Sequence, residues 1–247
     1  RTAARLAAMH DDTYWMRRAL DLARRGLYTT APNPRVGCVL VKNDVAVGEG
    51  WHQYAGEPHA EVHALRAAGD AASGATAYIT LEPCAHHGRT PPCADALIAA
   101  GIARAVIACC DPNPLVAGQG IARLRAAGIA VSENVCQAEA TALNRGFFRR
   151  ISTGRPFVTL KLAASLDGRT ALANGDSQWI TGEAARLDAH QHRLAADAII
   201  AGTGSIIADN ARLTARYPTD LPSRQPLRVI IDSRLQTPPD AAVFSEP

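Results

Sequence analysis

A histidine, a glutamate and two cysteines form the pattern in this sequence with the clearest chemistry. His59 and Glu61 stand two residues apart, and Cys84 and Cys93 follow further along the chain. One imidazole and two thiolates are three protein ligands for a zinc ion, which leaves the fourth tetrahedral position open to water, as in catalytic zinc sites. Glu61 is expected beside that position, where its carboxylate can take a proton from water and deliver it to a substrate. The pattern predicts a zinc-dependent hydrolytic enzyme with His59, Cys84 and Cys93 as metal ligands and Glu61 as the catalytic residue.

A structural zinc site or plain burial of the cysteines is the alternative. A structural site needs a fourth protein ligand, which His63, His86 or His87 could supply. His63 lies four residues after His59 on the same predicted helix face, where it is more often a packing residue than a ligand. The four other cysteines lie in apolar settings and are expected to be small core residues: Cys38, Cys109, Cys110 and Cys136.

The elements that must position these residues alternate between helices and strands. Apolar periodicity and capping residues predict helices over 12–25, 59–68, 93–100, 120–127 and 137–149. Short apolar runs predict strands over 36–41, 45–51, 75–81, 103–109 and 129–132, the first two joined as a hairpin. This alternation predicts a three-layer α/β/α domain, ending near residue 150 before the Ser152–Pro156 stretch.

The pattern then restarts without repeating. Strands are expected over 157–163, 198–201 and 227–231, and a helix over 183–195. The segment 202–205 follows a strand and opens a helix, so its N–H groups are candidates for a cofactor phosphate. No G-x-G-x-x-G motif follows the first strand, which argues against a dinucleotide-binding fold of the Rossmann type. We expect a second α/β domain over 151–247 that is C-terminally incomplete.

Composition excludes several classes of protein. The chain has 247 residues, of which 47% are hydrophobic and 20% charged, so a disordered chain is not expected. No apolar run approaches the ~18 residues that span a bilayer. The net charge of +3 and an aromatic content of 5% do not indicate nucleic-acid binding. These observations favour a cytoplasmic enzyme acting on a small molecule.

The metal pattern resembles the zinc-dependent cytidine-deaminase superfamily, whose signature is H-x-E…P-C-x-x-C. Here eight residues separate the two cysteines instead of two. The stretches HAEVHAL at 59–65 and TLEPCAHHGRTPPCADAL at 80–97 are similar to the deaminase half of the bifunctional riboflavin-biosynthesis deaminase/reductase family, which carries this longer insertion. The segments 33–37 and 48–52 are similar to it as well.

That resemblance implies a substrate. Members of the family hydrolyse 2,5-diamino-6-(5-phosphoribosylamino)pyrimidin-4(3H)-one to 5-amino-6-(5-phosphoribosylamino)uracil and release ammonia. It implies deaminase substrate-binding roles for Asn33, His52, His86 and Arg89. The turn at 111–114 is expected at the rim of this site.

The segments 161–169 and 177–181 resemble the reductase half of the same family, which is related to dihydrofolate reductase. That half reduces the ribosyl group to a ribityl group with NADPH. The resemblance implies reductase substrate binding by Lys161, Ser177, Arg193, Leu213 and Arg216, and cofactor binding by Ala163, Trp179, Ser205, Asp209 and Ser233. We also expect a homo-oligomer.

Three other interpretations remain open at this point. The chain could be a deaminase with a non-functional, truncated reductase half. It could be a nucleoside or tRNA deaminase, which would share the zinc core but would not need the second domain. It could also be a non-catalytic zinc-binding module. Family members continue well beyond residue 247, so we expect C-terminal sequence to be missing and the reductase site to be impaired without it.

Overall fold

The computed structural model describes residues 10–86, 92–114, 116–220 and 223–245. It divides into two compact units, Arg1–Phe157 and Val158–Pro247, and each is described by itself. No helix among the described residues combines the length and the apolar character needed to cross a membrane.

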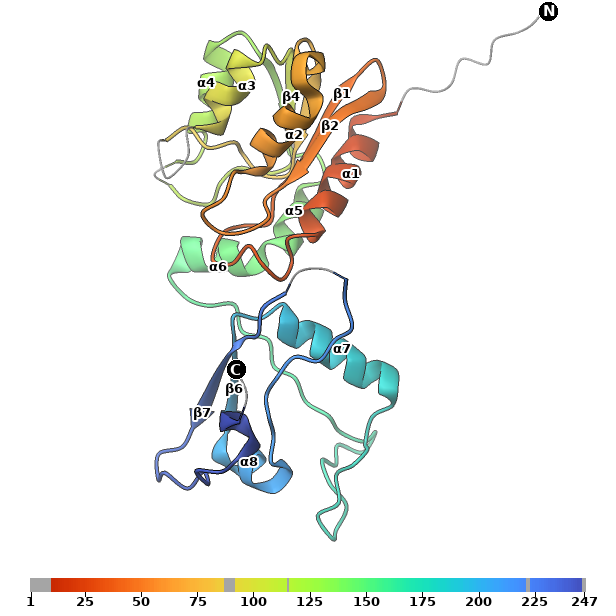
Figure 1. Ribbon diagram of the computed structural model, residues 1–247, viewed down its shortest axis with the longest axis vertical. Helices are drawn as coiled ribbons and strands as arrows, with labels where there is room; N and C mark the ends of the chain where they lie inside the picture. Colours follow the sequence, from red (N-terminus) through yellow and green to blue (C-terminus); the bar gives the residue numbers. More distant parts are fainter. Residues whose placement is uncertain (1–9, 87–91, 115, 221–222, 246–247) are drawn as a thin grey trace, which may run out of the picture. The chain divides into compact units, whose positions relative to one another are not determined.

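The first unit is built on a five-stranded mixed sheet (Figure 1). In spatial order the strands are β2 (Val45–Trp51), β1 (Gly37–Lys42), β3 (Thr76–Ile79), β4 (Arg104–Ile107) and β5 (Ala130–Glu133). β1 pairs antiparallel with β2 and β3, and β3, β4 and β5 run parallel. Asn43 and Asp44 connect β1 to β2 with φ of 52° and 59°, the left-handed conformation that tight hairpin turns require. The predicted hairpin is confirmed.

Helices cover both faces of this sheet. α1 (Asp12–Arg24) and α5 (Gln137–Leu143) pack on one face, and α2 (Ala60–Ala68), α3 (Cys93–Ala99) and α4 (Gln119–Ala126) on the other. β1 shows the alternation that a strand between two helical layers needs: Val39 and Val41 join the core under α1, whereas Cys38 and Leu40 join the core under α2, α3 and α4. The three-layer α/β/α prediction is confirmed.

Small residues let α2 lie unusually close to β2. A Cβ on Gly50 would fall 2.4 Å from the carbonyl oxygen of Ala60, a separation that no side chain tolerates. Gly48 makes the same kind of approach to Ala64, at 2.3 Å. The first turn of α2 is therefore held directly on the sheet, which fixes where His59 and Glu61 point.

A charged network ties α1 to the sheet. The Asp12 carboxylate accepts hydrogen bonds from Arg104 at 2.8 and 2.6 Å and from the Tyr78 hydroxyl at 2.9 Å. Hydrogen bonding from Arg104 lowers the pKa of Asp12 below its usual value. Asp11 caps the helix by accepting from the Tyr14 N–H at 2.8 Å, as the sequence predicts.

The predicted helix over 137–149 is wrong in one respect, because the chain forms two helices there. α5 ends before Asn144, and α6 (Arg145–Thr153) begins after it. The Asn144 side chain is buried, accepts from the Arg35 N–H at 2.8 Å and donates to the Arg35 carbonyl at 2.9 Å. This bridge to the segment just before β1 fixes the break.

The expectation of a buried Cys110 is also wrong, since that residue is exposed, whereas Cys38 and Cys109 are buried.

The second unit contains α7 (Glu183–Leu194), β6 (Ala198–Gly202), α8 (Thr203–Asp209) and β7 (Leu227–Ile231). β6 and β7 pair in parallel, and a small core gathers Ile206, Leu213, Ala241 and Val243. The described residues also form the 3₁₀ helices η1 (Gly69–Ala72) in the first unit and η2 (Ala242–Phe244) in the second.

The strand predicted over 157–163 is wrong, because the structure has no strand there. Its apolar alternation is present, but Val158, Leu160 and Leu162 are 78%, 80% and 72% exposed. A strand exists only when its backbone groups pair with a neighbour. The described β6–β7 sheet does not include this segment.

Candidate active site

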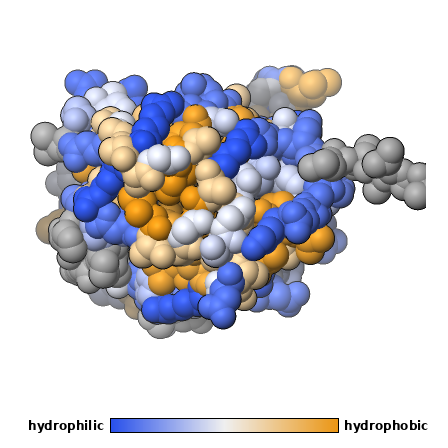
Figure 2. Space-filling view, turned by 90° about the horizontal axis from the view of Figure 1, so that it is seen from above, coloured by the Kyte–Doolittle hydropathy of each residue, from blue (hydrophilic) through white to orange (hydrophobic). Residues whose placement is uncertain are grey.

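The predicted metal ligands come from three segments at one end of the sheet. His59 is the N-cap residue of α2, Cys84 follows β3, and Cys93 is the first residue of α3. In α/β folds, sites form at the carboxyl ends of parallel strands, and Cys84 lies at that end of β3. Figure 2 shows one face of the molecule, on which hydrophobic residues gather between hydrophilic ones. Among the described residues, the only group of metal-binding side chains is His59, Cys84 and Cys93.

These three side chains have the spacing that a zinc ion needs. His59 Nδ1 lies 3.2 Å from Cys93 Sγ and 3.6 Å from Cys84 Sγ. Usual zinc–nitrogen and zinc–sulfur lengths put tetrahedral ligand atoms about 3.6 Å apart. All three candidate atoms lie within 4.8 Å of one another. The sequence prediction that these residues come together is confirmed.

The two thiols have opposite tendencies to ionise. Hydrogen bonding from Cys93 lowers the pKa of Cys84 well below its usual value, and the Cys93 N–H also donates to Cys84 Sγ at 3.3 Å. The pKa of Cys93 is raised far above its usual value because its thiol donates to Cys84 and is buried. Two adjacent thiolates repel each other unless a cation lies between them. The donor set therefore fits a divalent metal ion, and thiolate with imidazole is a set that zinc prefers.

Glu61 lies beside the ligands without joining their group. Its side chain is buried, and its Oε2 atom has no hydrogen-bond partner. Burial raises the pKa of this carboxyl to about 7. A buried carboxyl oxygen without a partner is costly, which is typical of a group reserved for a ligand. A carboxyl with a pKa near neutrality is also suited to proton transfer.

His52 connects Asn33 to the metal-binding residues. Its ring packs edge-on against the His59 ring, with centroids 5.4 Å apart. With Nδ1 donating to the Pro58 carbonyl at 3.2 Å, Nε2 accepts from the Asn33 amide at 3.1 Å. Burial lowers the pKa of His52, so the ring is neutral and keeps that acceptor. Asn33 is thus held with its amide oxygen available for another partner.

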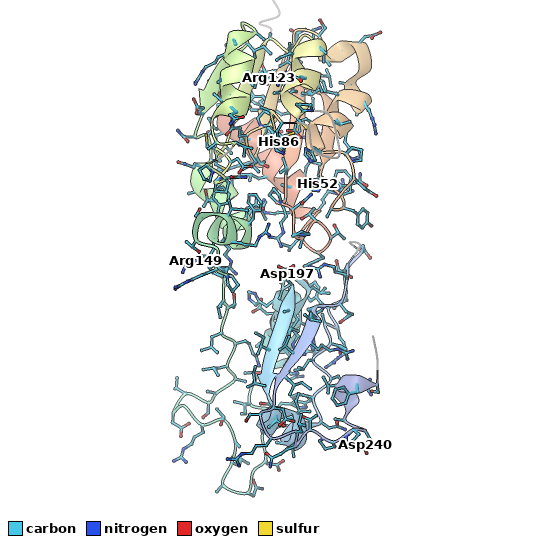
Figure 3. The ribbon with its side chains drawn as sticks, turned by 90° about the vertical axis from the view of Figure 1, so that its left-hand side faces the viewer. His52, His86, Arg123, Arg149, Asp197 and Asp240 are labelled. Atoms are coloured by element: carbon cyan, nitrogen blue, oxygen red, sulfur yellow. The ribbon has the colours of Figure 1, made fainter. Side chains whose placement is uncertain are left out.

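His86 and Asp111 lie near Cys84. His86 is exposed and comes from the segment after Cys84, on the same side of the unit as His52 (Figure 3). Burial raises the pKa of Asp111, and the carboxyl is close enough to His86 and Cys84 to feel both charges. Arg89, expected to bind the substrate phosphate, lies outside the described residues.

Glu82 is a residue of this region that sequence reasoning missed. Its carboxylate is 6% exposed and accepts from four backbone N–H groups, those of Asp111, Gly118, Gly120 and Ile121, at 2.9–3.3 Å. These four partners are backbone groups distant in sequence, so no side-chain pattern indicates them. The one available signal is an acidic residue at the end of a buried strand, directly before Pro83 and Cys84.

The second unit gathers several of its predicted residues around His190. Arg193 Nη1 donates to the Thr214 carbonyl at 3.0 Å, and the Arg216 N–H donates to His190 Nδ1 at 3.1 Å. Burial, followed by the charges of Arg193, Arg216 and Lys161, lowers the pKa of His190. Burial and Arg216 lower the pKa of Arg193 as well. Cations held this close fit an anionic ligand.

The other predicted reductase residues lie in separate places. Leu213 is buried in the small core of the second unit. Trp179 is 70% exposed, with the Arg186 guanidinium 4.5 Å from its ring centroid. Ser205 and Asp209 are exposed on α8 and Ser233 is exposed after β7, whereas Ser177 and Ala163 are half-buried in segments without regular structure.

Known proteins match both units. The cytidine and deoxycytidylate deaminase zinc-binding region matches residues 9–109, and the RibD C-terminal domain matches residues 156–247. The riboflavin biosynthesis protein RibD of Escherichia coli is 55% identical, over 96% of this chain and 67% of its own. The chain belongs to the RibD family. The RibD of Haemophilus influenzae is 51% identical, over 94% of this chain and 65% of its own.

Solved RibD structures agree with this family assignment. Acinetobacter baumannii RibD superposes with a TM-score of 0.90 at 54% identity, covering 96% of this chain and 67% of that one. A diaminohydroxyphosphoribosylaminopyrimidine deaminase/5-amino-6-(5-phosphoribosylamino)uracil reductase from Thermotoga maritima superposes with a TM-score of 0.88 at 41% identity, covering 95% and 67%. The chain thus spans about two thirds of the length of these RibD relatives. The resemblance seen in the sequence is confirmed.

Proposed function

We propose that this chain is a riboflavin-biosynthesis enzyme whose first domain, residues 1–150, hydrolytically deaminates 2,5-diamino-6-(5-phosphoribosylamino)pyrimidin-4(3H)-one. The observation that carries the proposal is the His59–Cys84–Cys93 group with the buried Glu61 carboxyl beside it, whose Oε2 atom has no hydrogen-bond partner. Family membership and the name of the Thermotoga maritima relative support the substrate and the reaction.

His59, Cys84 and Cys93 would hold a zinc ion through one nitrogen and two sulfur atoms. When bound, zinc supplies a Lewis acid that generates a nucleophile from water at neutral pH. Three protein ligands leave room for water, and the group contains no fourth side chain among the described residues. A structural site would need that fourth ligand. His63 and His86 are not part of the group, and His87 lies outside the described residues. The Oε2 atom of the buried Glu61, which has no hydrogen-bond partner, favours catalysis.

Glu61 is the proposed proton carrier. Its carboxylate would accept one proton from the attacking water and pass it to the ring nitrogen of the pyrimidine. It would then accept the proton of the hydroxyl group added to the ring carbon and pass it to the departing amine, so that the carbonyl forms as ammonia leaves. A pKa of about 7 allows the carboxyl to hold and to release that proton near neutrality. Burial keeps bulk water away from these transfers.

Substrate binding is assigned to residues around the metal group. The Asn33 amide, oriented by His52, would accept a hydrogen bond from the pyrimidine edge. Because His52 itself is 3% exposed, its main part is to hold Asn33 and the His59 ring. His86 and Arg89 would contact the phosphoribosyl group.

The second domain, residues 151–247, is proposed to contribute the NADPH-dependent reduction of the ribosyl group. Lys161, Arg193 and Arg216 would hold the substrate phosphate, with Ser177 and Leu213 completing the substrate residues. The cofactor residues are Ala163, Trp179, Ser205, Asp209 and Ser233. Gly202 and Gly204 have nothing within 4 Å of where a Cβ would stand, so a cofactor can approach the backbone between β6 and α8.

We further propose that the enzyme acts in the cytoplasm as a homo-oligomer. All six cysteines are free, which suits a reducing compartment. The proposal does not include nucleic-acid or membrane partners. Sedimentation of the purified chain at several concentrations tests the oligomeric part.

The decisive experiment replaces Glu61 by Gln and measures ammonia release from the diaminopyrimidine together with bound zinc. The expected result is full zinc content with ammonia release lowered about 10²–10⁴-fold, the usual contribution of a proton-transferring group. The control is Glu133→Gln, because Glu133 lies on β5, outside the metal group, and forms an ion pair with Arg125 of α4. Release at the wild-type rate by Glu61→Gln would contradict the mechanism. For the second domain, NADPH titration of the chain is the test: saturable binding would support the reductase assignment, and tight binding would contradict the expectation that its site is impaired.

A further inference from the structure

One arginine of α4 connects the two segments that carry the thiols. Arg123 Nη1 donates to the Ala85 carbonyl at 3.1 Å, and Arg123 Nε lies 2.5 Å from Asp95 Oδ1. Ala85 directly follows Cys84, and Asp95 is in the first turn of α3, two residues after Cys93. Arg123 and His86 lie on the same side of the unit (Figure 3). A single planar guanidinium therefore spans both thiol-bearing segments.

The helix that carries Arg123 is itself fixed to the same segment. The buried Glu82 carboxylate accepts from the N–H groups of Gly120 and Ile121 in the first turn of α4, at 2.9 and 3.3 Å. The Gly120 Cα packs directly on the Pro83 carbonyl, where an added Cβ would lie 1.9 Å from the oxygen. α4 is thus anchored at the residue before Cys84 and reaches the residue after it.

We propose that Glu82 and Arg123 are positioning residues that set the separation of the Cys84 and Cys93 sulfur atoms for metal binding. Neither touches the substrate or the reacting atoms. Glu82 holds the first turn of α4 on Pro83, and Arg123, one helical turn later, holds Ala85 and Asp95. The inference rests on the proposed zinc site and adds residues to it.

Two features make this arrangement more than ordinary packing. The two sulfur atoms must be held at a metal-binding distance, and Arg123 joins their segments by an ion pair to Asp95 and a hydrogen bond to the Ala85 carbonyl. Arg125, on the same helix, also forms an ion pair, but its partner is Glu133 on β5, away from the thiols. The two arginines thus form a matched pair that differs in what each one holds.

The experiment compares Arg123→Gln with Arg125→Gln in the zinc-loaded full chain. Zinc release is followed with a chromogenic chelator, and the cobalt-substituted proteins are compared by their thiolate–cobalt absorption. Loss of a group that orients metal ligands commonly costs 10–100-fold in metal affinity. We expect zinc affinity to fall about 10–100-fold in Arg123→Gln with a changed cobalt spectrum, and both to stay as in the wild type in Arg125→Gln.

Stability provides the discriminating control. Half-exposed ion pairs contribute little to stability, so the two variants are expected to unfold at the same denaturant concentration. Arg123→Lys, which can pair with Asp95 but has no second nitrogen for Ala85, is expected to give an intermediate zinc affinity. Glu82→Gln keeps the side-chain size but presents a donor to backbone N–H groups, and it is expected to release zinc faster as well.

Equal zinc affinity and equal cobalt spectra in Arg123→Gln and Arg125→Gln would overturn the inference. A lower affinity that is matched by an equal loss of stability would also overturn it, because the effect would then be structural. Failure of the wild-type chain to bind zinc would instead overturn the proposed function.

Discussion

The contact between Gly120 and Pro83 makes a sharp test of how the site is held. Gly120 is the second residue of α4, and replacing it by Ala would put a methyl carbon 1.9 Å from the Pro83 carbonyl oxygen and 3.3 Å from Glu82 Cγ. A carbon and an oxygen in contact normally stay more than about 3 Å apart. Either α4 or the Pro83–Cys84 segment must therefore move by more than about 1 Å.

The expected loss of stability follows from three contributions. Overpacking in a filled region costs about 1–3 kcal/mol. The Glu82 bonds to Gly120 and Ile121 would lengthen, and each hydrogen bond to a charged group is worth about 1.5–3 kcal/mol. Alanine recovers about 1 kcal/mol over glycine in a helix. With the bonds partly retained, we expect Gly120→Ala to lower the free energy of unfolding of the first unit by about 3 kcal/mol.

Gly146 provides the matched control. It is the second residue of α6, and nothing lies within 4 Å of where its Cβ would stand. Gly146→Ala should raise stability by about 0.5–1 kcal/mol. Urea unfolding is followed by tryptophan fluorescence in a Trp179→Phe background, so that only Trp15 and Trp51 of the first unit report. Equal unfolding midpoints for the two alanine variants would refute the close approach. We also expect Gly120→Ala to bind zinc more weakly, since the movement is next to Cys84.

Three more outcomes are expected. The pKa of Asp12 is lowered by Arg104, so the pair stabilises the fold at pH values above the unfolded-state pKa near 3.8. This contribution is lost as the pH falls through the lower pKa of the folded state. Asp12→Asn should flatten the stability–pH curve in that range, and an unchanged curve would contradict the network. Prolonged dialysis against a strong chelator should abolish ammonia release, and added zinc should restore it, whereas activity that survives with no bound metal would contradict the proposed chemistry. Asn33→Ala should raise KM about tenfold, the equivalent of one hydrogen bond of about 1.4 kcal/mol. His52→Ala should have the same effect, because His52 acts through Asn33. An effect of either variant on kcat alone would argue against a role in substrate binding.

Local signals predict the first unit well because its elements obey local rules. Prolines mark the starts of α2 and α3, and apolar alternation with a polar turn marks the β1–β2 hairpin. The metal group follows from the same signals, since two of its three ligands stand at those helix starts. The predictions that fail concern features that depend on residues distant in the chain. Asn144 breaks a helix because its side chain bonds the Arg35 backbone, more than a hundred residues away in the chain.

The strand predicted over 157–163 does not form, for the complementary reason. Its alternation is a real pattern, but a strand is a property of a pair of segments, and the sequence of one segment does not say whether its neighbour is in place. The exposed Leu160 and Leu162 are the direct consequence. A helix such as α7 satisfies its own backbone, and it forms at the predicted position within one residue at its C-terminal end.

The same distinction separates the residues that react from the residues that position them. His59, Glu61, Cys84 and Cys93 act through side-chain chemistry, which the residue type itself records, so spacing is enough to find them. Glu82 acts on backbone N–H groups, which every residue possesses, and its partners carry no mark in the sequence. Catalytic groups are useful only when held within a fraction of an ångström of their working geometry. Replacements at positioning residues are therefore expected to weaken metal binding, while Glu61→Gln leaves the metal bound and removes the proton transfer.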